Sequence, residues 1–254
     1  MADTNTTNLV GKLTNIADGF RTSRSLTETL SLDEMATLAA VPIGSTDNKL
    51  PQVIDKTVTE ITAEDLAGIT KIGTFAFTSC VNLTSVIIPN TVTILGNNAF
   101  TSCVKLTSII IPDSVLEMGS NMFQYCSALT TAVIGNGIQT LGSSTFQSCT
   151  NLTSVTIGNR VQTIGSSAFN TTKKLTSLTI PASVTRIKGD ALTIGSSTGK
   201  ATITFLRTTP PTIQKNSFNA DYLNKIIVPV GCGEAYRTAT NWADWADYIE
   251  EAAE

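Results

Sequence analysis

Hydrophobic residues in the middle of the chain return at a constant interval of 23 residues. The returning positions are leucines, phenylalanines and cysteines, namely Leu83, Leu106, Leu129, Leu152 and Leu175, then Phe77, Phe100, Phe123, Phe146 and Phe169, then Cys80, Cys103, Cys126 and Cys149. A fixed period of this length, with leucines in a short strand, is typical of a solenoid in which equivalent turns stack. We therefore expect a β-rich repeat array over residues 75–230. Such a stack offers long surfaces and few cavities, which favours binding over chemistry.

Each repeat contains two strand-like halves. In the first half, Leu83, Val86 and Ile88 are the residues expected to point into the core, and a proline or glycine then turns the chain. In the second half, Val92 and Leu95 are expected to point inward. A short helical turn that buries the following alanine and phenylalanine would complete the repeat.

The residues between the inward positions form two columns on the outer face of the first strands. The ten candidate binding residues are Ser85, Ser108, Thr131, Ser154 and Ser177 in one column and Ile87, Ile110, Val133, Thr156 and Thr179 in the other. The second column is apolar at its N-terminal end. Exposed apolar patches often mark a contact with a partner, whereas threonine, isoleucine and valine also suit any solvated sheet. Both interpretations stay open.

Two amphipathic segments precede the array. The first covers residues 5–24, and the second begins at a capping box, Ser31 to Glu34, and ends before Pro42. The apolar residues of these predicted helices are the candidate attachment residues, Leu9, Leu13, Ile16, Phe20, Leu32 and Met35. We assign residues 1–45 to a helical attachment module and residues 46–74 to a linker and N-terminal cap.

The chain ends in its densest aromatic cluster, at Tyr236, Trp242, Trp245 and Tyr248. These residues follow the last strand-like segment at nearly helical spacing, which predicts a C-terminal cap helix over residues 231–254. A terminal turn of a solenoid needs such a cap because its apolar face would otherwise be exposed.

The composition of the chain argues against several classes of function. The chain has no histidine, a formal net charge of −3 and 15% charged residues. The absence of histidine removes the His-dependent nucleophilic arrangements, and we expect no catalytic residue. Without a basic cluster we expect no nucleic-acid binding. The N-terminus lacks the pattern of a secretory signal, and no apolar run is long enough for membrane insertion.

The four periodic cysteines are the most conspicuous candidate ligands for a metal. Equivalent positions in stacked turns lie about 4.8 Å apart along a line, whereas zinc requires ligands that converge on one point. We therefore expect a buried ladder of thiols, no metal site and no cofactor. Cys232 lies outside this ladder and has no assigned role.

The repeat wording Ile-Gly-x-x-Ala-Phe-x-x-Cys-x-x-Leu-Thr-Ser-Val-x-Ile-Pro resembles the BspA-type leucine-rich repeats, over residues 53 to about 250. The resemblance implies a β-rich (α+β) solenoid with short N-terminal helices and a C-terminal helical cap. Members of this family are similar to bacterial surface adhesins, protist surface proteins and phage structural proteins. The resemblance therefore implies adhesion without naming a ligand.

The N-terminal segment also resembles a short helical module of phage tail-fibre and accessory virion proteins. The matching residues are Leu13, Ile16, Ala17, Arg21, Leu30, Leu32, Asp33, Glu34 and Met35, and the wording departs at Phe20. The resemblance implies a non-enzymatic virion protein that is assembled in the bacterial cytoplasm and binds other virion proteins through its N-terminal helices. We expect it to be a homo-oligomer or to be present in several copies on the particle, and to bind a host-surface glycan or protein.

Two alternatives stay open. The first is a bacterial BspA-like surface adhesin or protein-interaction module. The second is an enzyme that acts on cell-wall sugars through a pair of carboxylates, for which Glu60, Glu64 and Asp65 are the densest acid group near the array.

Overall fold

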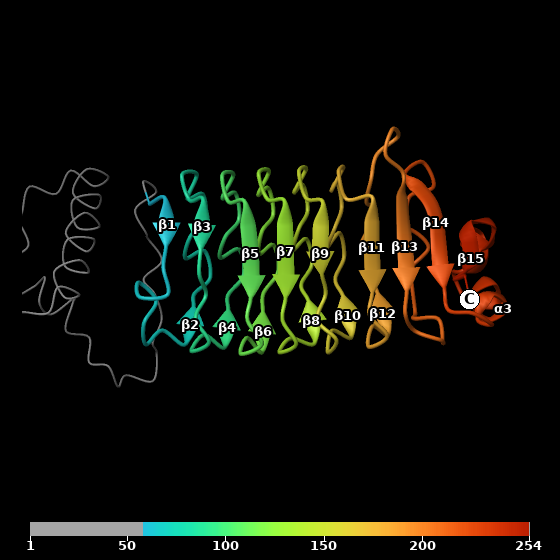
Figure 1. Ribbon diagram of the computed structural model, residues 1–254, viewed down its shortest axis with the longest axis horizontal. Helices are drawn as coiled ribbons and strands as arrows, with labels where there is room; N and C mark the ends of the chain where they lie inside the picture. Colours follow the sequence, from blue (N-terminus) through green and yellow to red (C-terminus); the bar gives the residue numbers. More distant parts are fainter. Residues whose placement is uncertain (1–57, 254) are drawn as a thin grey trace, which may run out of the picture.

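The computed structural model describes residues 58–253, which wind into one elongated coil of stacked turns (Figure 1). Strands on the first side of the coil are β1 (Glu60–Ile61), β3 (Ser85–Val86), β5 (Ser108–Ile111), β7 (Thr131–Ile134), β9 (Ser154–Thr156), β11 (Ser177–Ile180), β13 (Ala201–Phe205), β14 (Leu223–Val228) and β15 (Ile249–Glu251). Strands on the second side are β2 (Lys71–Ile72), β4 (Ile94–Leu95), β6 (Glu117–Met118), β8 (Thr140–Leu141), β10 (Thr163–Ile164) and β12 (Arg186–Ile187).

Neighbouring strands pair in parallel and in register with the repeat. On the first side the sheets are β1-β3, β5-β7-β9 and β11-β13-β14-β15, and on the second side they are β2-β4-β6 and β8-β10-β12. Ser108 faces Thr131, and Thr131 faces Ser154. Equivalent residues of successive turns therefore lie side by side, so each repeat position becomes a column along the coil.

The core confirms the predicted inward positions. The five residues predicted to point inward are buried, namely Leu83, Val86, Ile88, Val92 and Leu95. The periodic leucines, phenylalanines and cysteines are buried as well. The phenylalanine rings stack in pairs along the coil, with centroids 5.0 to 5.6 Å apart and planes inclined by 6 to 18°. One aromatic column thus runs through five consecutive turns.

The third side of the coil differs from the expected helical turn. Ala99 and Phe100 are buried as predicted, but the flanking residues Asn98 and Ser102 adopt left-handed backbone angles, with φ of 58° and 61°. This backbone aims its N–H groups at the next turn, because the Phe77 N–H donates to the Ala99 carbonyl oxygen at 2.8 Å. Most of the equivalent residues are polar, and asparagine is among the residues most often found in this conformation, although Phe75 and Tyr125 adopt it too.

The single cap helix predicted for residues 231–254 is wrong. The segment forms α3 (Gly233–Thr238), the 3-10 helix η1 (Ala243–Tyr248) and then strand β15, which pairs with β14 and extends the first-side sheet. The helix cannot continue because Ala239 is extended and Asn241 has a φ of 65°. The buried aromatic residues Tyr236 and Trp242 pack on Phe205, so the cap is a folded-over aromatic cluster.

The predictions for the N-terminus fall outside the described residues. These include both amphipathic helices, the linker up to residue 57 and the candidate attachment residues Leu9, Leu13, Ile16, Phe20, Leu32 and Met35. In the part of the chain that the structure describes, every helix is too short to cross a bilayer.

Candidate functional site

The ten candidate binding residues lie on one continuous face of the first-side strands. All ten are exposed, and within the sheet β5-β7-β9 the strand register aligns the columns: Ile110 faces Val133, which faces Thr156. We call the surface formed by these ten residues the first-side face. What it binds remains a prediction.

The outer column of the first-side face changes character along the coil. Ile87, Ile110 and Val133 are 58%, 64% and 39% exposed, although nonpolar side chains of this size are usually buried. Thr156 and Thr179 continue the same column with hydroxyl groups. The face therefore presents an apolar strip at its N-terminal end and a hydroxylated strip beyond it.

A third row of hydroxyls borders the face, and sequence reasoning did not single it out. The threonines of this row are exposed, and the hydroxyls of Thr84, Thr130 and Thr153 donate to the threonine carbonyl of the preceding turn at 2.8 to 3.1 Å. Threonine at the same position of every repeat was the available signal. These hydroxyls are occupied in holding turns together.

The column that contains Ser108, Thr131 and Ser154 differs from this threonine row in its hydrogen bonding. Among residues 58–253, the hydroxyls of Ser108, Thr131 and Ser154 have no hydrogen-bond partner. Each hydroxyl is both a donor and an acceptor. The column therefore offers a regular row of polar groups that are free to contact a ligand.

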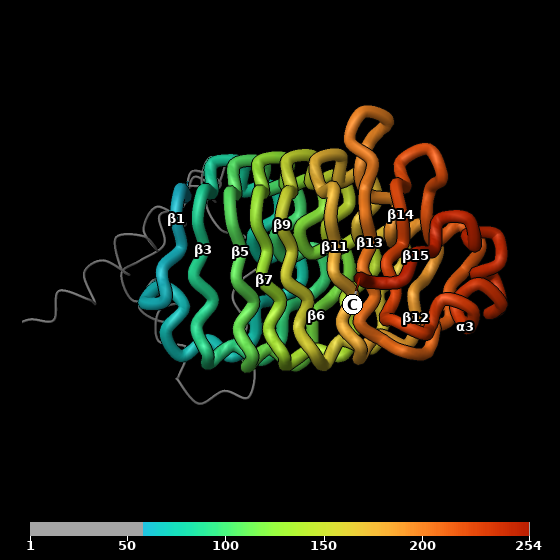
Figure 2. The backbone as a smooth tube through the Cα atoms, turned by 45° about the vertical axis from the view of Figure 1, so that its right-hand side comes forward, coloured from blue at the N-terminus to red at the C-terminus, as the bar shows by residue number. Residues whose placement is uncertain are grey.

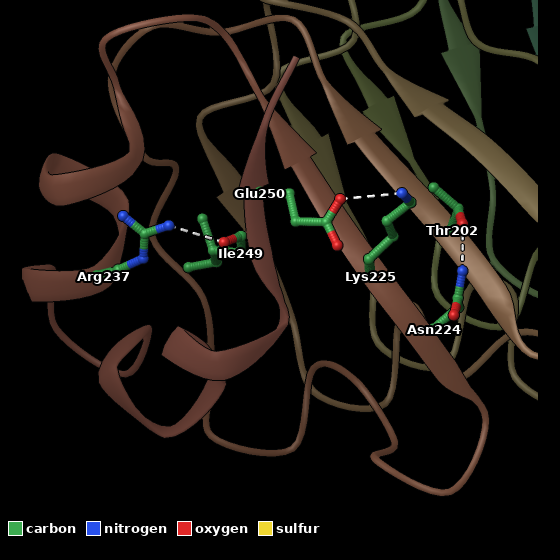
Figure 3. A network of polar contacts seen from close by, with 6 residues as sticks. All are labelled: Thr202, Asn224, Lys225, Arg237, Ile249 and Glu250. Atoms are coloured by element: carbon green, nitrogen blue, oxygen red, sulfur yellow. Dashed lines mark hydrogen bonds and ion pairs between the residues drawn. The ribbon is translucent and has the colours of Figure 1, made fainter. Parts of the chain in front are cut away.

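At the C-terminal end of the first side, in the sheet β11-β13-β14-β15, side chains contact one another (Figure 3). Lys225 and Glu250 form an exposed ion pair at 2.9 Å, and the Asn224 amide donates to the Thr202 hydroxyl at 3.2 Å. Beside them, the Gly231 and Gly233 N–H groups donate to Glu251 at 2.8 Å each and lower the pKa of its carboxyl. We therefore place the candidate face at the N-terminal and central turns.

The periodic cysteines form the expected buried column of free thiols. Three of the thiols donate to a phenylalanine carbonyl of the preceding turn: Cys103 to Phe77 and Cys126 to Phe100 at 3.2 Å each, and Cys149 to Phe123 at 3.1 Å. Burial raises the pKa of Cys149 to about 12. Residues 58–253 contain no cluster of three or more histidine, cysteine or acidic residues able to hold a metal ion.

The acid group near the start of the array has a structural contact of its own. The Asp65 carboxylate accepts the Thr62 backbone N–H at 2.9 Å and the Thr62 hydroxyl at 2.8 Å. These bonds close the turn after β1. Glu60 and Glu64 are exposed.

Two of the hollows on the described surface have volumes of several hundred Å³. One of about 440 Å³ lies on the second side and is lined by Leu116, Glu117 and Arg160 among others. The other, of about 340 Å³, lies near the loops that lead into β13 and β14 and is lined mainly by polar residues. Neither hollow includes any of the ten residues of the first-side face.

A coil of parallel strands with a periodic leucine core defines a leucine-rich repeat solenoid. A family model described as the BspA type leucine rich repeat region matches residues 70–197 in six copies. The chain belongs to this family. Among curated proteins, none matches the sequence.

Solved structures of leucine-rich repeat proteins are similar to the chain. A protein from Bacteroides ovatus has a TM-score of 0.50 at 18% identity, over 81% of this chain and 57% of that one, a likeness of fold alone. The T. pallidum leucine rich repeat protein is 30% identical over 54% of this chain and 66% of its own, with a TM-score of 0.46. A leucine rich cell surface protein from Faecalibacterium prausnitzii is 17% identical over 78% of this chain and 64% of its own, with a TM-score of 0.45. The chain thus spans less than two thirds of each.

Proposed function

We propose that the protein is a non-enzymatic adhesion or protein-interaction module that binds a surface ligand with its first-side face. The observation that carries the proposal is the exposed strip of Ile87, Ile110 and Val133 beside a row of unpartnered hydroxyls. An apolar strip supplies area that gains free energy when it leaves water, and polar groups beside it supply orientation. The adhesins among the BspA-type proteins support the same class of function.

Residues found at the same position in other repeats suggest a variant that changes the first-side face and keeps the fold. Threonine occupies the outer column at Thr156 and Thr179, so Ile87→Thr, Ile110→Thr and Val133→Thr together extend a pattern that the coil already accommodates. A matched control is Leu116→Thr, which removes an apolar side chain that is 59% exposed on the second side. Thr93 occupies the equivalent position one turn earlier.

The experiment measures saturable binding of the labelled full-length protein to a panel of whole bacteria and purified cell-surface polymers. We expect the triple variant to weaken binding by about tenfold or more, which corresponds to about 1.4 kcal/mol. The Leu116→Thr control should bind like the native protein. Equal binding of the native protein and the triple variant would exclude the face as the binding surface.

A virion protein attached through its N-terminus is the second candidate. It is favoured by the sequence motif that includes Leu13, Ile16 and the segment from Leu32 to Met35. The family match covers residues 70–197 and does not include this motif. None of the three structures named above is described as a virion protein. The first candidate therefore has the stronger support, and the attachment residues stay a prediction.

Removal of residues 1–45 separates the two candidates. In a virion protein the truncated chain should fold and bind its surface ligand but no longer join the particle, as measured by particle purification and immunoblotting. Incorporation equal to that of the full chain would contradict the attachment role. Loss of ligand binding after the same truncation would instead contradict the assignment of binding to the array.

A further inference from the structure

Comparison of the repeats shows which residues a turn needs in order to fold. The turn that leads into β13 is longer than the turns before it. Ser177 pairs with Thr202, 25 residues later, whereas Thr131 and Ser154 are 23 residues apart. The added length lies in residues 195–200, which lead into β13. In Figure 2 this loop and the loop that leads into β14 stand side by side above the edge of the coil, in orange and red.

The smaller hollow lies between these two loops and the turn beneath them. Its lining includes Asn170, Lys173, Asp190, Ser196, Asn219 and Tyr222, and its volume is about 340 Å³. Most of these side chains are half-buried, and Lys173 is exposed. This size is within the range of sites that hold small molecules.

Two charges in the hollow replace small residues of the repeat. Lys173 occupies the position of Ser127 and Thr150, and Asp190 occupies the position of Ser144 and Ser167. Since the two preceding turns fold with serine or threonine there, and the earlier turns with other uncharged residues, neither charge is needed to form a turn. Both changes fall in the lining of one hollow.

Neither of these charged groups contacts an opposite charge in the described part of the chain. Among residues 58–253, the Asp190 carboxylate and the Lys173 ammonium have neither an ion pair nor a hydrogen bond through the side chain. Neither charge therefore stabilises the described part of the fold through an ion pair or a side-chain hydrogen bond. The two groups leave an acceptor and a donor available to a ligand.

Two asparagines are oriented so that their donors stay available. The Asn170 Oδ1 accepts the Thr171 hydroxyl at 2.5 Å, and the Asn219 Oδ1 accepts the Asp221 N–H at 2.9 Å. Each amide therefore keeps its NH₂ group without a partner among the described residues. The Tyr222 ring adds an apolar surface with a phenol at its end.

We propose that this hollow binds a small saccharide. A sugar ring carries adjacent hydroxyls that each donate and accept a hydrogen bond, and these match a carboxylate acceptor beside ammonium and amide donors. The ring also has an apolar face that suits an aromatic side chain. Because the hollow is lined by one charge of each sign, a ligand with a net charge is attracted by one group and repelled by the other, whereas a neutral polyhydroxylated ligand can hydrogen-bond to both.

The site is separate from the first-side face and its test does not depend on that face. Each charged position has a variant that restores the residue found one turn earlier, namely Lys173→Thr and Asp190→Ser. Lys174→Thr is the matched control, because Lys174 is a neighbouring exposed lysine outside the lining. The control changes the same charge without touching the hollow.

The experiment uses ligand-observed NMR of the full chain with a panel of soluble mono- and disaccharides, followed by calorimetry of the strongest binder. We expect saturation transfer to at least one saccharide, a loss of affinity of at least about tenfold in the Lys173→Thr/Asp190→Ser variant, and native affinity in Lys174→Thr. Binding to no member of the panel, or equal affinity in the double variant, would overturn the proposal. Loss of affinity in the double variant while the Ile87, Ile110 and Val133 triple variant retains it would place the saccharide in the hollow.

Discussion

Phe100 and Phe123 lie with their ring centroids 5.6 Å apart and their planes inclined by 14°. The two residues occupy the same position in successive turns, so the parallel register of the strands stacks their rings. Both side chains are fully buried. Each ring therefore belongs to the core of its own turn and to the interface with the next.

The first prediction concerns this aromatic column. Phe123→Ala removes a buried ring that stacks on two neighbours, and we expect the free energy of unfolding to fall by about 3–5 kcal/mol. Urea unfolding followed by circular dichroism measures the change.

Phe75→Ala is the control for the aromatic column. Phe75 is 50% exposed, and its replacement should change the free energy of unfolding by no more than about 0.5 kcal/mol. Equal losses in the two variants would show that stacking between turns does not stabilise the coil.

The sequence predicted the core well because the coil repeats in register. One period predicted that Leu83, Val86 and Ile88 lie inside, and the equivalent residues of the following four turns are buried too, apart from Val155, which is partly buried. The exposure of the ten face residues follows from the same alternation, since a residue beside two inward neighbours in a strand points outward.

The C-terminal end and the third side differ from the prediction for local reasons. Periodicity does not specify backbone angles, so it predicts a helical turn where Asn98 and Ser102 are in fact left-handed. At the C-terminus, the aromatic spacing matched a helix, but Asn241 interrupts it and the chain returns to the sheet as β15. In both places the backbone angles of a few turn residues set the path of the chain.

The saccharide site could not be found from the repeat alone. Lys173 and Asp190 are visible as departures from the pattern, but they become one site only because the loop at residues 195–200 lies next to the loop with Asn219 and Tyr222. The arrangement of such loops depends on their turn chemistry and not on the period.

The second prediction concerns alkaline pH. Burial raises the pKa of Cys149 from its ordinary value of 9.0 to about 12. Between these values the unfolded chain releases a proton that the folded chain keeps, so stability is fully present below pH 9 and falls as the pH rises toward 12.

The measurement is urea unfolding between about pH 8 and about pH 11 under reducing conditions. Cys149 should contribute up to about 1.4 kcal/mol of lost stability per pH unit. Cys149→Ala removes this contribution while other alkaline groups remain, so its stability should fall less steeply with pH. Parallel pH profiles for the native protein and the variant would contradict the prediction.

The third prediction concerns a close approach of two backbones. Gly137 packs against the preceding turn so tightly that a Cβ atom would collide with the carbonyl oxygens of Val115 and Asp113. Serine occupies the equivalent positions Ser114 and Ser183. Restoring the repeat with Gly137→Ser should nevertheless lower the free energy of unfolding by about 1–3 kcal/mol, because backbone atoms must move.

Gly199→Ser is the comparison for Gly137→Ser. A Cβ at Gly199 would come no closer than 3.4 Å to its nearest neighbour, Thr176 Cγ2, which is an ordinary contact. Thermal unfolding of both variants measures the difference. If Gly137→Ser were as stable as the native protein, the close packing of this turn would be disproved.

The fourth prediction separates two buried tryptophans in the C-terminal cluster. The Trp242 Nε1 donates to the Pro211 carbonyl oxygen at 2.8 Å, whereas the Trp245 Nε1 is buried and has no partner among residues 58–253. Replacing either with phenylalanine removes a similar volume, but only Trp242→Phe leaves a carbonyl without its donor. We therefore expect Trp242→Phe to be less stable than Trp245→Phe by about 1–3 kcal/mol in urea unfolding. Equal stabilities would show that the bond to Pro211 does not help to hold the cap, whereas the expected order would show that the cap is stabilised by a directed hydrogen bond as well as by aromatic packing.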